Sequence, residues 1–197
     1  MRNLILVTGS MRTGKTSLCK ALFSILEKKS ACPFAIIEEN RRDERGIPLT
    51  IVLHDLGRKE LLHFASRTAS QGDDYLPFNF NTEAFVWALD KLKEAISQGC
   101  GPVILDEIGA LEAKRGGGFL MDAVWAMDHG EGSLVLTLRP ELEENLLERL
   151  SSMTKIGPVE RFRLGSTDPE KLALTVADYV LSIASPGNEL YIQSMHL

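Results

Sequence analysis

The sequence contains few of the residues that mark disulfide frameworks and transition-metal sites. It has three cysteines, Cys19, Cys32 and Cys100, and four histidines. An odd number of cysteines without paired spacing suggests neither a disulfide framework nor a zinc ribbon, so we expect three isolated thiols in a reducing cytoplasm. The histidines are scattered, and no two have the helical spacing that places a pair of metal ligands on one face. We therefore do not expect a transition metal held by protein ligands.

Long apolar runs and an excess of positive charge are also missing. The first apolar run, residues 4–7, is far too short for a signal-peptide core or a membrane span, and no other stretch is long enough. We therefore expect no membrane contact. The formal net charge of -5 gives no overall basic field to attract nucleic acid, although it leaves room for a local basic patch. Nucleic acid is thus a poor first hypothesis for a partner.

The remaining composition is that of an ordinary globular protein, with 44% hydrophobic and 25% charged residues. Short apolar runs alternate with segments of helical periodicity, which predicts an α/β fold. The predicted strands are 4–8, 34–38, 49–56, 103–105, 134–138 and 159–164. The predicted helices are 16–29, 81–98, 119–127, 140–150 and 168–183. We expect residues 1–185 to form one domain, and 186–197 to be a tail that is either poorly ordered or used in a contact.

The two strands 34–38 and 49–56 are separated by a charged loop, residues 40–46, which cannot be buried. The sequence therefore predicts that this pair leaves the core as a hairpin-like excursion.

Residues 9–16 read Gly-Ser-Met-Arg-Thr-Gly-Lys-Thr and match GxxxxGK[ST] at every fixed position. An apolar strand leads in and an amphipathic helix leads out, which is the arrangement of a phosphate-binding loop, the Walker A motif. In such a loop, inward-facing backbone N–H groups and the positive end of the helix cradle phosphate oxygens. The alternative is a glycine-rich turn with an incidental surface lysine, which the flanking strand and helix disfavour.

Within this loop, Lys15 is expected to reach the β- and γ-phosphates of a nucleoside triphosphate such as ATP or GTP. The Thr16 hydroxyl has the reach to ligate magnesium, the expected cofactor. The residues predicted to bind the nucleotide are Gly9, Ser10, Met11, Arg12, Thr13, Gly14, Lys15, Thr16 and Ser17.

A second acidic site follows the apolar strand at 103–105, where Asp106 and Glu107 stand side by side. Ligands collect at strand ends in open α/β sheets, so Asp106 is expected to hold magnesium, directly or through water, as in a Walker B motif. Glu107 is predicted to be catalytic together with Lys15, because it can orient or deprotonate the water that attacks the γ-phosphate. The alternative is an exposed strand end with two solvated acids. Glu112 either faces the site or begins the following loop.

Several further polar residues are candidates for the site. Thr137 and Arg139 end the strand at 134–138, where they either sense the γ-phosphate or simply leave the core. A charge-stabilising arginine is also expected. Its candidates are Arg12, Arg41, Arg42, Arg45, Arg161 and Arg163, with Arg12 favoured because it lies inside the loop. Trp87 and Trp125 are assigned to packing.

Together, the phosphate loop, the acidic block 106–112 and the strand 134–138 resemble the cancer-related nucleoside-triphosphatase family of archaea, bacteria and animals. The block Asp-Glu-Ile-Gly-Ala-Leu-Glu keeps the fixed residues of the family pattern and is followed by Phe119. Arg45-Gly46 and the segment 75–85 resemble further family features, so the resemblance extends to about residue 165. The chain departs from the family at residues 11–13, where a Pro-Gly-Val type of loop is commoner, and at the glycine-rich segment 114–118.

The resemblance implies a P-loop NTPase with a RecA-like, three-layer α/β/α architecture and a mostly parallel central sheet. In that architecture, a strand inserts between the strand carrying the phosphate loop and the strand carrying Asp106. The resemblance also implies slow, magnesium-dependent hydrolysis of several nucleoside triphosphates.

Two other functions stay open. One is a nucleotide or small-molecule kinase, which needs an acceptor pocket and usually an arginine-bearing lid. The other is a non-catalytic, nucleotide-operated binding module. Glu107 favours hydrolysis over transfer because its position suits a water nucleophile. The sequence does not say whether the chain has a protein partner.

Overall fold

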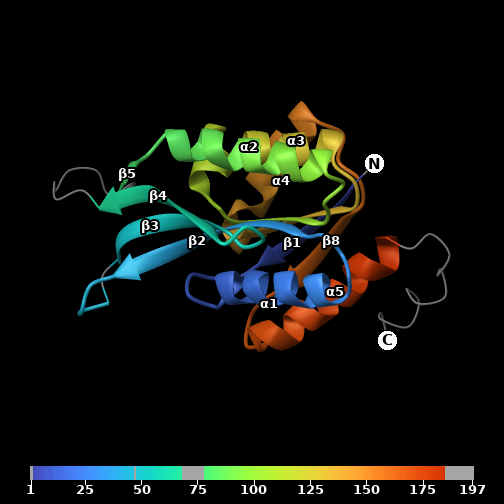
Figure 1. Cartoon of the computed structure of the whole chain (residues 1–197), viewed down its shortest axis with the longest axis horizontal. Helices are drawn as coiled ribbons and strands as arrows, with labels where there is room; N and C mark the ends of the chain where they lie inside the picture. Colours follow the sequence, from blue (N-terminus) through green and yellow to red (C-terminus); the bar gives the residue numbers. More distant parts are fainter. Residues whose placement is uncertain (1, 47, 68–77, 185–197) are drawn as a thin grey trace.

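An eight-stranded sheet runs through the centre of the chain, and helices cover both of its faces (Figure 1). The computed structural model describes residues 2–46, 48–67 and 78–184, so the predicted tail 186–197 and Tyr75 lie outside the described residues. The strands are β1 Asn3–Thr8, β2 Phe34–Arg42, β3 Pro48–Asp55, β4 Glu60–Arg67, β5 Phe78–Phe80, β6 Val103–Ile108, β7 Ser133–Leu138 and β8 Val159–Arg163. The helices are α1 Lys15–Lys28, α2 Glu83–Ser97, α3 Leu120–His129, α4 Glu143–Met153 and α5 Pro169–Ala184, with a π-helical turn η1 Leu111–Arg115 and a 3-10 turn η2 Pro140–Leu142.

The strand order is β5-β4-β3-β2-β6-β7-β1-β8. The strands from β2 through β6, β7 and β1 to β8 are parallel, whereas β3, β4 and β5 extend one edge in antiparallel fashion. β7 lies between β1 and β6, which confirms the strand insertion that the resemblance implied. The predicted excursion is also confirmed, because β2 and β3 pair as a hairpin. β4 and β5, which follow it, were not predicted.

Both faces of the parallel strands are buried, as the unbroken apolar run in β1 predicts. Residues 4–7 have no solvent exposure. Leu4 and Leu6 pack into the cluster under α2, α3 and α4, while Ile5 and Val7 pack into the cluster with α1 and α5 on the opposite face (Figure 1). The strand thus links two cores, and its carboxyl end is held rigidly where the phosphate loop begins. Trp87 and Trp125 pack against the first cluster, which confirms their assignment to packing.

One sequence expectation about the cysteines is wrong. Cys32 and Cys100 form a disulfide between residues 68 positions apart, with Cα atoms 4.8 Å apart, while Cys19 is a buried free thiol. Cys32 precedes β2 and Cys100 precedes β6, and these two strands are neighbours in the sheet. The pairing depends on strand order, so the spacing along the sequence could not reveal it. The argument for a reducing compartment from three isolated thiols therefore loses its premise.

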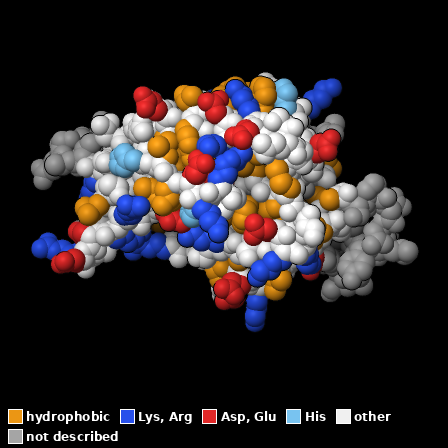
Figure 2. Space-filling view, in the orientation of Figure 1, with side chains coloured by type: hydrophobic (Ala, Val, Ile, Leu, Met, Phe, Trp, Pro, Cys, Tyr) orange, Lys and Arg blue, Asp and Glu red, His pale blue; other side chains and the backbone are white. Residues whose placement is uncertain are grey.

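The surface carries charges of both signs. On the face shown in Figure 2, Lys and Arg side chains are interspersed with Asp and Glu side chains and with apolar ones. Among the described helices, none combines the length and the apolar character needed to cross a membrane.

A buried carboxyl in α3 gives the fold a pH dependence. Asp122 is 3% exposed, and its Oδ1 has no hydrogen-bond partner among the described residues. Burial raises the pKa of Asp122 from 3.8 to about 7, with a smaller contribution from the charge of Glu112, while a backbone hydrogen bond and Lys93 oppose the rise. Ionising this group in the folded protein therefore costs free energy that the unfolded chain does not pay.

Asp122→Asn is expected to stabilise the protein at about pH 8 and to have little effect at about pH 4. Between the unfolded and folded pKa values the folded state binds more protons, so the free energy of unfolding of the parent falls as the pH rises toward 7. The gain at high pH is at most about 4 kcal/mol, from roughly three pKa units at 1.36 kcal/mol each. Urea unfolding of both proteins across this pH range measures it. A gain that is equal at both pH values contradicts the assignment to Asp122 ionisation.

Candidate nucleotide site

The phosphate loop connects β1 to α1 and is held by its own polar groups and by α5. The Thr13 hydroxyl donates to the Ser10 carbonyl oxygen at 2.9 Å. Gly14 caps α1 with a φ of 99°, and a Cβ atom there would lie 2.6 Å from Pro169 Cγ, so both conformation and space require glycine. Met11 and Arg12 are exposed at the tip. The loop thus has a fixed backbone with side chains turned outward, as a phosphate cradle needs.

Lys15 joins this loop to the end of β6. Its side chain is buried, and Nζ donates to the carbonyl oxygens of Gly9 at 3.2 Å and Ser10 at 3.3 Å. The same Nζ lies 3.5 Å from Glu107 Oε1. The ammonium therefore stands between the loop and the acidic strand end, where it can meet phosphate oxygens laid on the loop.

Thr16 and Asp106 form the pair that was predicted to hold magnesium. Thr16 Oγ1 donates to Asp106 Oδ2 at 2.6 Å, although 90 residues separate them. Burial raises the pKa of Asp106, while hydrogen bonds from Thr137 and Thr16 lower it. A hydroxyl and a carboxylate side by side suit magnesium, which takes few protein oxygens and completes its shell with phosphates and waters. The donor set therefore fits the metal, and magnesium ligation by these residues stays a prediction.

A bulge in β6 aims Glu107 back at Lys15. Leu105 pairs with Leu136 and Ile108 with Leu138, so one extra residue is fitted into β6 between them. Glu107 has a φ of 57°, which is rare for a residue with a side chain and typically costs about 1–3 kcal/mol. Its side chain is 38% exposed and carries the contact to Lys15. The strain places a solvent-accessible carboxylate beside the phosphate loop.

Thr137 on β7 fastens this bulge. Its hydroxyl donates to Asp106 Oδ1 at 2.5 Å and accepts the Glu107 N–H at 2.9 Å. The residue has no solvent exposure, so it does not end a strand that leaves the core. Nor does its hydroxyl have a free donor for a phosphate, because Asp106 takes its hydrogen. Thr137 therefore acts through its two neighbours.

Thr137→Val is expected to reduce both stability and turnover, since valine has the shape of threonine but removes the hydroxyl donor to Asp106 Oδ1 and leaves the Glu107 N–H without its acceptor. A buried polar group left unpaired costs about 1–3 kcal/mol, which urea unfolding can measure. Steady-state phosphate release measures the loss in kcat. Thr137→Ser keeps the hydroxyl and is the matched control. If Thr137→Ser loses as much stability and kcat as Thr137→Val, the loss comes from packing and the role given to the hydroxyl is wrong.

Glu112 belongs to the loop and not to the cleft, which settles the alternatives left open for it. The residue is 4% exposed, its Oε2 accepts the Gly109 N–H at 2.8 Å, and its Oε1 accepts the Phe119 N–H at 3.0 Å. A Cβ atom at Gly118 would lie 1.8 Å from Glu112 Oε1, so the glycine-rich segment makes room for this carboxylate. Glu112 therefore closes the connection between β6 and α3.

These elements enclose a cleft of about 540 Å³ at the carboxyl ends of the parallel strands. Arg12, Arg42 and Arg139 line it, whereas Arg161 instead makes an ion pair with Glu143 at 2.6 Å. Four lining residues were not predicted for the site: Glu38, Asn40, Ile51 and Phe78. The full lining is Met11, Arg12, Gly14, Lys15, Thr16, Glu38, Asn40, Arg42, Ile51, Phe78, Glu107 and Arg139.

The alternation of β2 explains how two of the missed residues, Glu38 and Asn40, reach the cleft. Glu38, Asn40 and Arg42 share one face of the strand because side chains two positions apart point the same way. β2 continues to Arg42, so Asn40 and Arg42, which were predicted to lie in the charged loop 40–46, extend the strand. Burial raises the pKa of Glu38 well above its ordinary value, and the charges of Glu107, Asp106 and Glu112 add to the rise.

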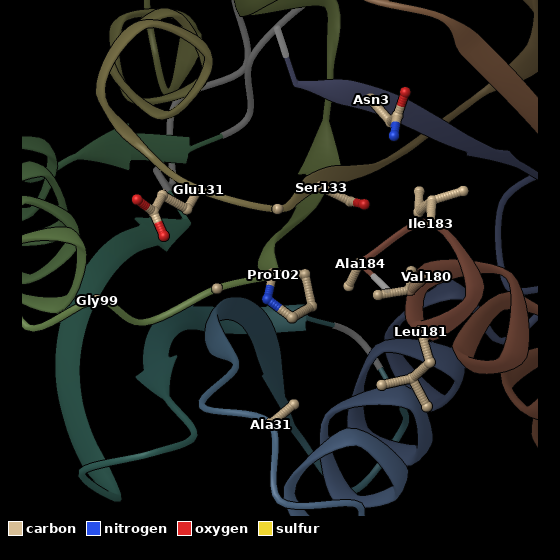
Figure 3. Close-up of a pocket in the computed structure, with 12 residues that line it drawn as sticks. Asn3, Ala31, Gly99, Pro102, Glu131, Ser133, Val180, Leu181, Ile183 and Ala184 are labelled. Carbon is tan, nitrogen blue, oxygen red and sulfur yellow. The ribbon is translucent and has the colours of Figure 1, made fainter. Parts of the chain in front are cut away.

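A second cavity, of about 470 Å³, lies at the opposite, amino ends of the strands (Figure 3). Val180, Leu181 and Ile183 of α5 form its apolar side, and Glu131 is its charged residue. Neither the phosphate loop nor the acidic strand end reaches it. The chemistry of the chain therefore gathers in the cleft at the carboxyl ends.

Comparisons with known proteins give the family and the fold of the chain. Residues 4–170 match the model of a protein family described as NTPase. Among solved structures, the chain is similar to THEP1 from the hyperthermophile Aquifex aeolicus, with 16% identity, coverage of 91% of this chain and 99% of that one, and a TM-score of 0.61, which shows the shared fold. A nucleolar GTP-binding protein 1 from Plasmodium falciparum aligns at 9% identity over 99% and 94% of the two chains, but its TM-score of 0.31 carries no weight. No curated protein matches the sequence.

Proposed function

This chain belongs to the NTPase family, and we propose that it hydrolyses nucleoside triphosphates, ATP and GTP among them, to diphosphate and phosphate with magnesium. The observation that carries the proposal is the convergence of four groups. Lys15 Nζ lies 3.5 Å from Glu107 Oε1, and Thr16 Oγ1 lies 2.6 Å from Asp106 Oδ2. The first pair combines a phosphate-binding cation with a water-activating carboxylate, and the second offers oxygen ligands to a metal.

Each group has a distinct task in the proposed reaction. The loop N–H groups and Lys15 bind the β- and γ-phosphates and offset the charge that develops on them. Glu107 holds the attacking water and takes its proton, while the water oxygen bonds to the γ-phosphorus and the bond to the bridging oxygen breaks. Thr16 and Asp106 would hold magnesium, which would supply charge neutralisation to the phosphates. Base preference is broad in this proposal because each contact it uses is to phosphate, metal or water.

Phosphate release from ATP, GTP, CTP and UTP tests the proposal, each with magnesium and with excess chelator. We expect release with magnesium for several triphosphates and background release with chelator. Undiminished release in chelator contradicts the metal requirement. The absence of release from every triphosphate contradicts hydrolysis itself.

Phosphoryl transfer to another molecule is a second candidate, favoured by the extent of the cleft. The cavity continues past Lys15 and Glu107 to Asn40, Arg42 and Phe78 of the excursion, which gives an acceptor space beside the γ-phosphate. Adding nucleoside monophosphates and small alcohols to the same assay distinguishes the two. A phosphorylated acceptor formed in place of free phosphate supports transfer, and unchanged phosphate release supports hydrolysis.

A further inference from the structure

Glu38 occupies the carboxyl end of β2, next to the strand that carries Asp106 and Glu107. β2 and β6 are parallel neighbours with Ile36 opposite Leu105, and Glu38 lies two positions further along, as Glu107 does in β6. Both carboxylates line the cleft together with Lys15. The fold therefore brings a second acidic side chain to the γ-phosphate side of the phosphate loop.

The neighbouring residue Glu39 has a structural role, because its carboxylate is held by basic side chains of the fold. Its Oε1 lies 2.7 Å from Lys20 Nζ and 3.0 Å from His54 Nδ1. Because side chains alternate along a strand, Glu39 turns away from the face that carries Glu38. The Glu38 side chain makes no hydrogen bond and no ion pair within residues 2–46, 48–67 and 78–184, although its backbone pairs with β3 opposite Leu53. No side-chain contact therefore explains the position of this carboxyl group.

Each of the other carboxylates near the cleft has at least one oxygen engaged. Asp106 accepts from Thr16 and Thr137, Glu112 accepts two backbone N–H groups, and Glu107 pairs with Lys15. Among the described residues, Glu38 and the Oε2 atom of Glu107 therefore keep acceptor capacity for a donor that enters the cleft. A phosphate cannot be that donor, since it brings oxygens and negative charge. A water molecule beside the γ-phosphate can, because it has two hydrogens to donate.

We propose that Glu38 is a second catalytic carboxylate, which accepts a hydrogen bond from the attacking water while Glu107 accepts the other. The inference rests on the proposed hydrolysis. As the water oxygen bonds to the γ-phosphorus and the bond to the bridging oxygen breaks, one proton passes to Glu107. The second hydrogen stays on the phosphate that forms, directed at Glu38. A water molecule held by one acceptor can rotate about that hydrogen bond. Two acceptors fix its orientation, and with it the direction of the lone pair that attacks phosphorus.

Variants of the full chain test this role, with Glu39→Gln as the matched control one residue away. Glu38→Gln keeps a weaker, neutral acceptor and is expected to lower kcat about tenfold, and Glu38→Ala about a hundredfold. The nucleotide dissociation constant and the magnesium concentration for half-maximal rate should change by less than about threefold, because Glu38 touches neither group in this assignment. Glu39→Gln should keep the parental kcat. Since both carboxylates act on one water, Glu38→Gln with Glu107→Gln should be little slower than Glu107→Gln alone.

The outcomes separate this role from the others. Parental kcat in Glu38→Ala, with Glu107→Gln impaired, overturns the inference and leaves hydrolysis intact. A raised magnesium requirement in Glu38→Ala overturns the inference, because it assigns Glu38 as a metal ligand. Weakened nucleotide binding at parental kcat also overturns the inference, because it assigns Glu38 to a contact with the bound nucleotide. If the parent protein releases no phosphate, the proposed function fails first and this inference fails with it.

Discussion

Lys15→Ala is expected to weaken the binding of nucleoside triphosphates by roughly 10- to 150-fold, the equivalent of a charge-assisted contact of about 1.5–3 kcal/mol. The ammonium is held between the Gly9 and Ser10 carbonyl oxygens and the Glu107 carboxylate. Alanine leaves the loop backbone in place but removes the buried cation of the cleft. The carboxylate of Glu107 then faces the phosphates unopposed, which adds repulsion to the lost attraction.

Titration calorimetry with ATP and with GTP in magnesium measures this effect. Lys20→Ala is the matched control, because Lys20 lies on the same helix and pairs with Glu39 at 2.7 Å, outside the set of residues that line the cleft. We expect the control to bind as the parent does. An affinity for Lys15→Ala within about threefold of the parent contradicts the assignment of residues 9–16 as a phosphate loop.

The elements that sequence predicted best are those whose signal is local. The run at residues 4–7 is apolar at every position because both faces of β1 are covered, and the phosphate loop follows it at once. Gly14 could be located from the motif because a left-handed helix cap admits little else. The alternation of strands and helices fixed the α/β class in the same way.

The parts that were missed depend on neighbours distant in the sequence. β4 exposes half of its side chains and lies beside the short edge strand β5, so its apolar pattern is weak. The Cys32–Cys100 disulfide requires β2 and β6 to be adjacent. Thr137 gains its role from a bulge on another strand, and no pattern around residue 137 indicates the bulge.

Glu107→Gln is expected to stop turnover almost completely while the protein still binds nucleotide. Glutamine has the shape of glutamate and can still hydrogen-bond, but it carries no charge and cannot take a proton. A general base typically contributes about 10²–10⁴-fold in rate, so kcat should fall by that amount. The bulge should persist, because the N–H of residue 107, which Thr137 accepts, is unchanged by the substitution.

Affinity should survive the substitution because the proposed ground-state contacts come from the loop and from Asp106. The glutamine also removes the ion pair that draws Lys15 toward β6, which frees the ammonium for phosphate, so this change should not weaken binding. Asp106→Asn is the contrasting variant, since its oxygen is shared with the Thr16 hydroxyl at 2.6 Å and its loss should weaken magnesium-dependent binding as well as rate. Single-turnover phosphate release together with nucleotide titration separates the two patterns. Parental release by Glu107→Gln places the base elsewhere and favours transfer or a nucleotide-operated binding module, whereas slow release at unchanged affinity assigns the proton transfer to Glu107.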